Sequence, residues 1–372
     1  MSSIQFEPAR AILEAAVEQR AFPGAALAVG HKDETTIIPV GRLTYDAGSA
    51  AVSADTIYDL ASLTKVVATT TAAMILFERG ALQLDRPVAL YLPDFIEPYD
   101  TAADPLWAVR GEITIRHLLA HTSGLPAYER FFLRAREKAH VIEEALALPL
   151  EDSPGRKTIY SDVGFILLGA ILEQVCGRSL DAFCEAEIFN PLGMKDTCFN
   201  PPEALRERVA PTEDDLEFRK RLIRGDVHDE NAWVMGGVAG HAGLFGTATD
   251  LARFGRMLLQ DGSVRGEAGP RQIVRPDTIR EFTRPWPAAE GTARGLGWDK
   301  PSGEPPSCGR YFSASAYGHL GFTGTSIWID PPRSLFVVLL TNRVHPTREN
   351  EAIRRMRPAV HDAVVQTLPG TS

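Results

Sequence analysis

The residues best suited to chemistry are a serine and a lysine three positions apart, Ser62 and Lys65. They begin an apolar segment with helical spacing that runs to Gly80, so both side chains should share one face of the first turn. A serine at a helix N-terminus combines a hydroxyl with an unpaired backbone N–H, which suits a developing oxyanion. A partly buried lysine can lose its own proton and accept that of the serine. We interpret the pair as the nucleophile and base of acyl transfer; alternatively, Ser62 only caps the helix and Lys65 is solvated.

A tyrosine ahead of another helix is the second candidate for catalysis. Tyr160 lies two residues before Asp162, and an apolar helix is predicted to begin at Val163. The phenol could relay the proton of Ser62 to the leaving group, with the nearby lysine favouring its phenolate. Asp162 could orient the lysine by accepting a hydrogen bond. The alternative is that Tyr160 packs as an amphipathic core residue and Asp162 caps the helix.

A glycine-rich segment at residues 318–326 is the third element, and it leads directly into a predicted strand. Its glycines allow the backbone to approach a substrate closely. The N–H of Phe322, next to Gly321, could complete an oxyanion pair with the N–H of Ser62. His319 would then stand at the rim of the site as a polar contact for the substrate or leaving group. The alternative is ordinary turn chemistry, because glycines are common where a chain enters a strand.

The elements that must position these residues fall into two groups. At the chain ends, apolar periodicity predicts a helix at 6–17, strands at 25–30, 36–40, 326–330 and 335–342, and a helix from about 348 to 367. We expect them to form an antiparallel sheet flanked by helices. In the remainder, helices are predicted at 115–120, 163–176, 180–189 (opened by Ser179) and 250–260 (opened by Thr249). Residues 1–80 with 247–372 should thus form an α/β region and 81–246 a mainly helical one, in one compact unit with the site in the cleft between them.

The bulk properties restrict the partners. A chain of 372 residues with 44% hydrophobic content is expected to fold into a soluble protein with a sizeable core. A net charge of −9 without clustered Lys and Arg argues against nucleic acid or an anionic membrane as partner. The apolar stretches are shorter than the roughly 20 residues that cross a bilayer. The start lacks the features of a secretory signal, so we expect a cytoplasmic location. The expected partner is a small acyl substrate, and the oligomeric state stays open.

Several other kinds of site are disfavoured. The four cysteines form no CxxC pair, so we interpret them as reduced and structural rather than as a nucleophile or redox pair. The sequence has no HExxH, and we interpret His121, His228, Asp229 and His241 as residues that order loops rather than as metal ligands. The absence of Gly-x-Ser-x-Gly, P-loop and dinucleotide motifs excludes an ordinary α/β-hydrolase and predicts no cofactor.

The three motifs, in this order and at these separations, resemble the family of class C β-lactamases, low-molecular-weight penicillin-binding proteins and family VIII carboxylesterases. The likeness covers nearly the whole chain and includes residues 113–125, 227–232, 236–245 and 295–299. It implies a β-lactamase/transpeptidase-like α/β (α+β) fold, with helices on both faces of an antiparallel sheet and the active site beside a helical region. It also implies Ser62 as nucleophile, Lys65 as base and Tyr160 as the group that relays protons.

Two departures from this family bear on the substrate. Asp162 stands where the family often has Asn, and its charge would raise the pKa of Lys65 and pass more of the base role to Tyr160. The segment 319–321 is His-Leu-Gly instead of Lys-Thr-Gly or Lys-Ser-Gly, so it lacks the hydroxyl and cation that hold a substrate carboxylate. We therefore expect a carboxylesterase-like hydrolase of esters or amides, ahead of a D,D-carboxypeptidase, penicillin-binding protein or weak β-lactamase. A non-catalytic binding protein with the same fold is the alternative of a different class.

Overall fold

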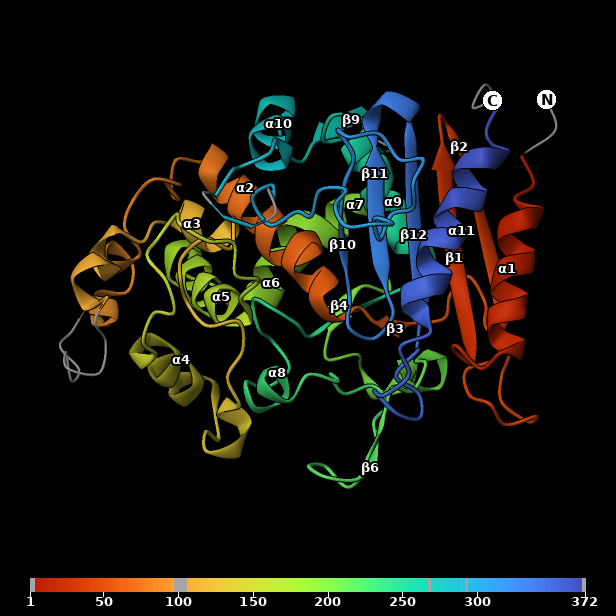
Figure 1. Ribbon diagram of the computed structural model, residues 1–372, viewed down its shortest axis with the longest axis horizontal. Helices are drawn as coiled ribbons and strands as arrows, with labels where there is room; N and C mark the ends of the chain where they lie inside the picture. The colour runs from red at the N-terminus through yellow and green to blue at the C-terminus, as the bar shows by residue number, and fades with distance from the viewer. Residues whose placement is uncertain (1–3, 97–105, 267–268, 289, 292–293, 370–372) are drawn as a thin grey trace.

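A five-stranded antiparallel sheet forms one side of the molecule in the computed structural model, which describes residues 4–96, 106–266, 269–288, 290–291 and 294–369 (Figure 1). The strand order is β10–β11–β12–β1–β2. The strands are β1 (Gly24–His31), β2 (Glu34–Gly41), β10 (Tyr317–Leu320), β11 (Ser326–Asp330) and β12 (Leu335–Thr341). Because β1 pairs with both β2 and β12, the two ends of the chain meet at the centre of the sheet, which confirms the prediction.

The side chains of the sheet alternate between two cores, as the period of a strand requires. In β1, Leu27 and Val29 belong to one core, whereas Ala26 and Ala28 belong to the other. The first core is closed by α1 (Glu7–Glu18) and α11 (Ile353–Thr367), which pack against each other. The second core is closed by α9 (Ala248–Leu259), which packs on β1 and β12, and continues into the helical region. Helices therefore cover both faces.

The helical region is built around α5 (Asp162–Cys176), which packs against α2 (Thr71–Glu78), α3 (Ile115–Leu119) and α4 (Lys138–Ala147). Ser161 caps its N-terminus by accepting a hydrogen bond from the N–H of Gly164, and Gly177 ends it with φ +65°. The other helices here are α6 (Leu180–Cys184), α7 (Asn190–Leu192) and α8 (Glu230–Val234). Among the described residues no single helix is long and apolar enough to span a membrane. Taken together, α5 and residues 180–192 meet that criterion of length and composition, but the two helices are bent by 68° relative to each other.

Shorter strands and one more helix complete the described chain. β3 (Tyr58–Asp59), β7 (Leu244–Gly246) and β4 (Cys198–Phe199) form a three-stranded sheet that joins the segment before Ser62 to the residues after His241. Two hairpins, β5 (Asp214–Asp215) with β6 (Arg221–Leu222) and β8 (Ser263–Gly266) with β9 (Gly269–Gln272), and the helix α10 (Pro276–Thr283) are peripheral. The three-stranded sheet is the one that bears on the site, because its strand β3 ends directly before the segment that carries Ser62.

The segment from Ser62 to Gly80 is not the continuous α-helix that its periodicity predicts. It begins as a 3-10 turn (Ala61–Leu63), passes through a π-helical stretch (Lys65–Thr70) and becomes α-helical only in α2 (Thr71–Glu78). The hydroxyl of Thr71 donates to the carbonyl of Val66, five residues back, at 2.8 Å, which supports the wider turn. Ser62 nevertheless lies at the N-terminal end, as predicted.

Two predicted helix starts were wrong. α9 is capped by Thr247, whose hydroxyl accepts from the N–H of Asp250, whereas the hydroxyl of Thr249 donates to the carbonyl of Ala54. α11 begins at Ile353 rather than near Arg348, because the Arg348 N–H donates to Glu213 and the carbonyls of Arg348 and Asn350 accept from Arg343. Local spacing gives no signal for such tertiary contacts.

Candidate active site

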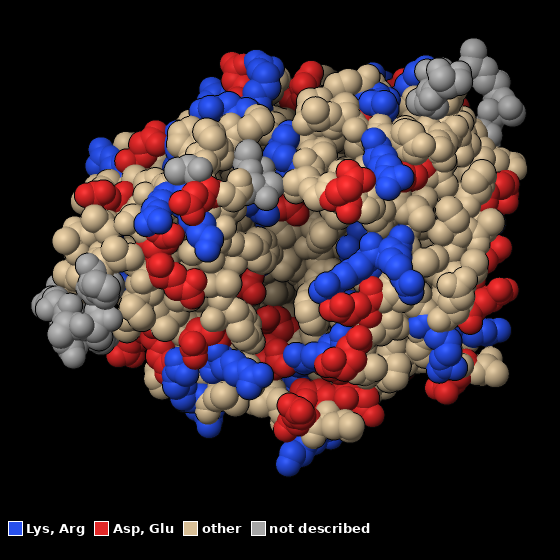
Figure 2. All heavy atoms as spheres, in the orientation of Figure 1, with Lys and Arg blue, Asp and Glu red and all other residues tan. Residues whose placement is uncertain are grey.

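A cleft of about 1510 Å³ brings the predicted site residues together. Figure 2 shows it as a hollow near the middle of the face that is drawn. The predicted residues that line it are Ser62, Tyr160, Asp162, His319, Gly321 and Phe322. Lys65 is fully buried beneath them. A smaller hollow of about 570 Å³, between Phe77 and Leu90, contains none of these residues.

Lys65 is the centre of the site. Its Nζ lies 3.1 Å from Ser62 Oγ, 2.6 Å from Asp162 Oδ1 and 3.0 Å from the carbonyl oxygen of His241. The three contacts come from the nucleophile segment, the start of α5 and the loop before β7. The ammonium is thus fixed between a hydroxyl, a carboxylate and a carbonyl, and Asp162 orients it as expected.

A buried aspartate shapes the turn that carries the serine. Asp59 accepts hydrogen bonds from the N–H of Ala61 at 2.8 Å and from the N–H of His228 at 2.6 Å. Ala61 adopts φ +47°, a strained region for a residue with a Cβ, directly before Ser62. The spacing of the sequence gave no indication of this role for Asp59, because one of its partners lies 169 residues away.

The loop at residues 321–325 is hydrogen-bonded to the turn that precedes Ser62. Thr323 Oγ1 donates to the carbonyl of Asp59 at 2.8 Å, and Thr325 Oγ1 donates to the carbonyl of Leu60 at 3.0 Å. A Cβ on Gly321 would lie 2.6 Å from that Leu60 carbonyl, so the close approach requires glycine. These contacts place Phe322 beside the nucleophile segment. Its pairing with the Ser62 N–H as an oxyanion site stays a prediction.

The charge of Lys65 is set by two opposing influences. Burial is the largest and lowers its pKa, but Asp162 and then Tyr160 raise it, and the pKa ends above its usual value. For Tyr160, burial raises the pKa of the phenol most, and the opposing effect of Lys65 and Ser62 does not offset it. Both directions favour the protonated forms near neutral pH; Tyr160 keeps 37% of its surface exposed, and its phenolate stays a prediction.

Removing the Asp162 carboxylate should shift the pH dependence of turnover. In Asp162→Asn the largest influence that raises the pKa of Lys65 is gone while burial still lowers it, so the neutral amine appears at lower pH. The rising limb of the pH–rate profile, measured with a p-nitrophenyl ester as test substrate between about pH 6 and 10, should shift to lower pH. Asp85→Asn, which removes a carboxylate paired with Arg116 outside the cleft, should leave the limb in place. An unmoved limb in Asp162→Asn would exclude Lys65 as the titrating group.

Two neutral histidines flank Tyr160. The ring of His121 lies 4.6 Å from the tyrosine ring, and that of His319 lies 5.8 Å from it. His121 Nδ1 accepts the N–H of Ser161 at 2.9 Å, and His319 Nδ1 donates to the carbonyl of Leu320 at 2.8 Å. Burial lowers the pKa of His319 most, to about 4, so the ring is uncharged at neutral pH. With 1% of its surface exposed, His319 lies inside the site and not at its rim, so that expectation was wrong.

A partly buried ion pair, absent from the predicted site, lies beside these rings. Arg294 contacts Asp299, and its guanidinium lies 5.3 Å from the ring centre of Tyr160. Both residues line the cleft. The segment 295–299 was already part of the resemblance to the family, and that was the only signal in the sequence for this pair.

The remaining histidine and acidic candidates order loops through hydrogen bonds. His228 Nε2 lies 2.9 Å from Glu213 Oε2, and His241 Nε2 lies 2.9 Å from Asp229 Oδ1. Asp229 also caps α8 by accepting the N–H of Ala232. Within the described ranges, no group of three or more His, Cys, Asp or Glu side chains is arranged to hold a metal ion.

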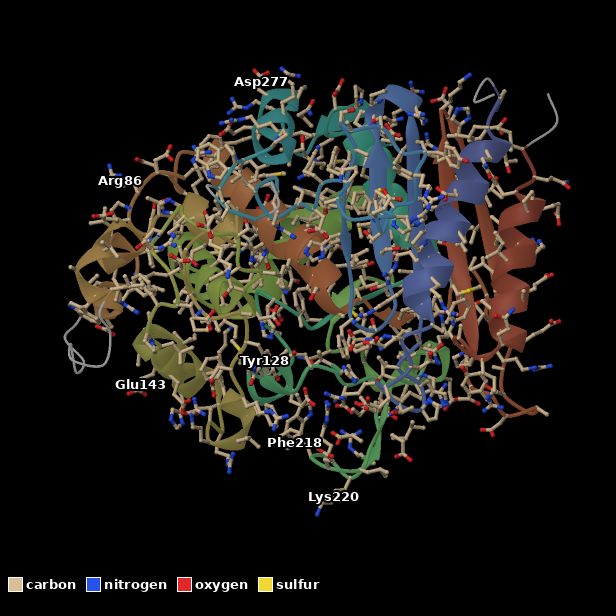
Figure 3. The ribbon with its side chains drawn as sticks, in the orientation of Figure 1. Arg86, Tyr128, Glu143, Phe218, Lys220 and Asp277 are labelled. Atoms are coloured by element: carbon tan, nitrogen blue, oxygen red, sulfur yellow. The ribbon has the colours of Figure 1, made fainter. Side chains whose placement is uncertain are left out.

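Apolar and aromatic side chains form part of the outer wall of the cleft. Tyr128, Leu133, Leu216 and Phe218 line one side, and Leu216 has 75% of its surface exposed. Figure 3 shows Tyr128 and Phe218 in the lower half of the molecule, and Lys220 at the tip of the β5–β6 hairpin, directed away from the cleft. Residues 213–218 and 228–230 all line the cleft.

Comparison with known proteins agrees with this architecture. The profile of the Beta-lactamase family matches residues 9–361. A "Putative D-alanyl-D-alanine carboxypeptidase" of Escherichia coli (strain K12) is 37% identical over 316 residues, which is 78% of this chain and 70% of the relative. An "N-acetylmuramyl-L-alanine amidase" of Bacillus subtilis (strain 168) is 35% identical over 357 residues, 87% of this chain and 78% of the relative.

The fold is also found in solved structures. The structure of EstCE1, described as a hydrolase with promiscuous acyltransferase activity, has a TM-score of 0.74 and 22% identity, covering 96% of this chain and 97% of that one. This confirms the predicted β-lactamase/transpeptidase-like fold. The fold, together with the hydrolase names of the relatives, defines a serine hydrolase. The chain belongs to the Beta-lactamase family.

Proposed function

We propose that the protein is a carboxylesterase-like hydrolase that acts on esters or amides through an acyl-enzyme on Ser62. The observation that carries this is the 3.1 Å contact between Lys65 Nζ and Ser62 Oγ, beside the Tyr160 ring and at the floor of a large cleft. A hydroxyl in contact with a fixed amine, which can accept its proton once the amine is deprotonated, is the arrangement that nucleophilic catalysis requires.

The reaction follows from these positions. Ser62 Oγ attacks the acyl carbon while its proton passes to Tyr160 or Lys65, in the form of the cluster that has lost one proton. The backbone N–H groups of Ser62 and Phe322 stabilise the oxyanion. The leaving group takes the proton as its bond to the acyl carbon breaks, and water then attacks the acyl-enzyme and regenerates Ser62. Because Lys65 and Tyr160 both hold their protons near neutrality, turnover should increase with pH.

The ester preference is inferred from the position of His319. In many β-lactamases and penicillin-binding proteins a lysine stands here, whereas this ring is buried and neutral at pH 7. The substrate carboxylate that such a cation would hold has no charged partner at this position. We therefore place esters ahead of β-lactams as substrates.

Turnover of a short-chain p-nitrophenyl ester should exceed that of a chromogenic cephalosporin when both are measured at the same enzyme concentration. Intact-protein mass spectrometry after exposure to each compound should show an acyl adduct or ester turnover in wild type and neither in Ser62→Ala. A fluorophosphonate should label wild type but not Ser62→Ala. Preference for the cephalosporin would contradict the ester assignment, and the absence of any serine-dependent label or turnover would favour a non-catalytic binding protein.

A peptidase or amidase is the second candidate. The curated relatives at 35–37% identity carry the names of a carboxypeptidase and an amidase, so an amide bond is the alternative target. Release of D-alanine from a peptide ending in D-Ala-D-Ala, or a stable penicilloyl adduct on Ser62, would support this assignment over the esterase.

A further inference from the structure

Two buried arginines form part of the cleft wall and have no role in the reaction described above. Arg343 follows β12 directly, and Arg357 lies in α11. Only 7% and 6% of their surfaces are exposed, yet both line the cleft that contains Ser62. Figure 2 shows basic side chains along the right-hand side of the hollow, the side on which Figure 1 places β10 and α11.

Neither guanidinium has a carboxylate partner within 4 Å among the residues that the structure describes. Arg343 Nε donates to the carbonyl of Phe322 at 2.8 Å, and Nη1 donates to two further carbonyls. Arg357 Nη2 donates to the carbonyl of Thr325 at 3.3 Å, and its Nε has no hydrogen-bond partner. Burying a charge without a counter-ion is costly, so the pair requires an explanation.

Three acidic residues of this wall pair with other arginines. Glu213 and Glu230 both pair with Arg348, at 2.5 and 2.7 Å. Glu351 pairs with Arg354 at 2.7 Å, on the exposed part of α11. Burial lowers the pKa of Arg357 most, and Arg343 adds to this, giving a pKa of about 10. The Arg357 guanidinium therefore remains charged at neutral pH, beside that of Arg343.

The position of the pair connects it to the reacting groups. Arg343 donates to the carbonyl of Phe322, and its guanidinium carbon lies 4.4 Å from the centre of the Phe322 ring. Arg357 donates to the carbonyl of Thr325, in the same loop whose threonines bind the turn before Ser62. An anion held by the arginines would thus lie next to the loop that we place at the oxyanion.

We propose that Arg343 and Arg357 form a subsite for an anionic group of the substrate, so that the preferred substrates are esters or amides that carry a carboxylate away from the scissile bond. This inference rests on the proposed function and specifies its substrate class. The subsite is separate from position 319, where relatives of the family carry their cation. Guanidinium groups match the planar geometry of a carboxylate and can supply two parallel hydrogen bonds.

Two matched pairs of esters test this subsite. On the acyl side, mono-p-nitrophenyl glutarate is compared with p-nitrophenyl valerate; on the leaving-group side, the butyrate ester of 3-hydroxybenzoate is compared with phenyl butyrate. Wild type should prefer the acid in at least one pair by about ten-fold in kcat/KM, the amount that one charged hydrogen bond supplies. Arg357→Met should abolish that preference, mainly through KM for the acid.

The control is Arg354→Gln, which removes an exposed arginine that lines the same cleft from the same helix but is paired with Glu351. It should keep the preference for the acid. Folding of each variant is followed by its melting temperature and by fluorophosphonate labelling of Ser62. Arg357→Met should melt no lower than wild type, because it removes a buried charge that has no counter-ion.

A preference unchanged in Arg357→Met, or absent in wild type for both pairs, would overturn the subsite. If wild type hydrolyses none of the four esters, the proposed function fails, and the subsite is judged by binding alone. Glutarate or 3-hydroxybenzoate should then raise the melting temperature of Ser62→Ala and not that of Ser62→Ala with Arg357→Met. Equal shifts in the two proteins would overturn the subsite.

Discussion

Lys65→Met should lower ester turnover by about three orders of magnitude, in line with the loss of a positioned proton acceptor. Methionine fills much of the volume of the buried lysine but cannot accept the proton of Ser62, whose Oγ lies 3.1 Å from the ammonium. The substitution also leaves Asp162 without its partner, but that side chain has 20% of its surface exposed. The free energy of unfolding should therefore fall by only about 1–3 kcal/mol. Steady-state kinetics and urea denaturation check the two expectations.

Lys300→Met is the matched control for the loss of a partly buried lysine. Its ammonium donates to the carbonyls of Thr283 and Ser315, and burial lowers its pKa to about 8. The residue does not line the cleft. Turnover in Lys300→Met should stay within about two-fold of wild type. Comparable activity in the two variants would remove Lys65 from the proton transfer and leave Tyr160 as the base.

Gly240→Ala should destabilise the protein by about 2–3 kcal/mol, at the upper end of overpacking effects. A Cβ at this position would lie 2.1 Å from the carbonyl oxygen of Phe165 in α5, a backbone atom that cannot move aside. The loop would have to shift, and with it the carbonyls that accept from Thr69 at 2.6 Å and from Lys65 at 3.0 Å. Turnover should fall together with stability. Urea denaturation and ester kinetics measure both effects.

Gly48→Ala is the comparison for the loss of glycine itself. A Cβ there would meet nothing within 4 Å, so stability should change by at most about 0.5 kcal/mol. A similar loss of stability in both variants would show that the close approach of Gly240 to α5 does not stabilise this part of the fold.

The sequence was sufficient for the parts of the fold and site that depend on local spacing. The short apolar runs of β1 and β12, each beside a turn sequence, predicted the sheet, and the separation of Ser62 from Lys65 placed both in one turn. Tyr160 could be joined to that pair only through the resemblance to a family, because no local rule connects residues so far apart. Its contact with the lysine is now observed.

Contacts between distant residues could not be predicted in this way. His319 is buried by rings that belong to other segments, such as Tyr160. Local sequence gives no sign of this burial, so the expected position at the rim was wrong. Asp59 acts through His228, and Arg294 through the ring of Tyr160, both partners that only the tertiary structure brings near. The π-helical stretch after Lys65 was missed for a related reason, because its apolar residues satisfy the period of an α-helix equally well.

The arrangement of the large sheet affects how the chain can fold during synthesis. β1 occupies the space between β2 and β12, and β12 is translated about 300 residues after β1. At about 5–20 residues per second, the ribosome needs on the order of 15–60 s to deliver that partner. Throughout this interval the β1–β2 hairpin has one unpaired edge and an uncovered apolar surface. The β1–β2 edge is therefore open to non-native strand pairing until β12 is made, and the part of the fold that contains the N-terminus is the last to be completed.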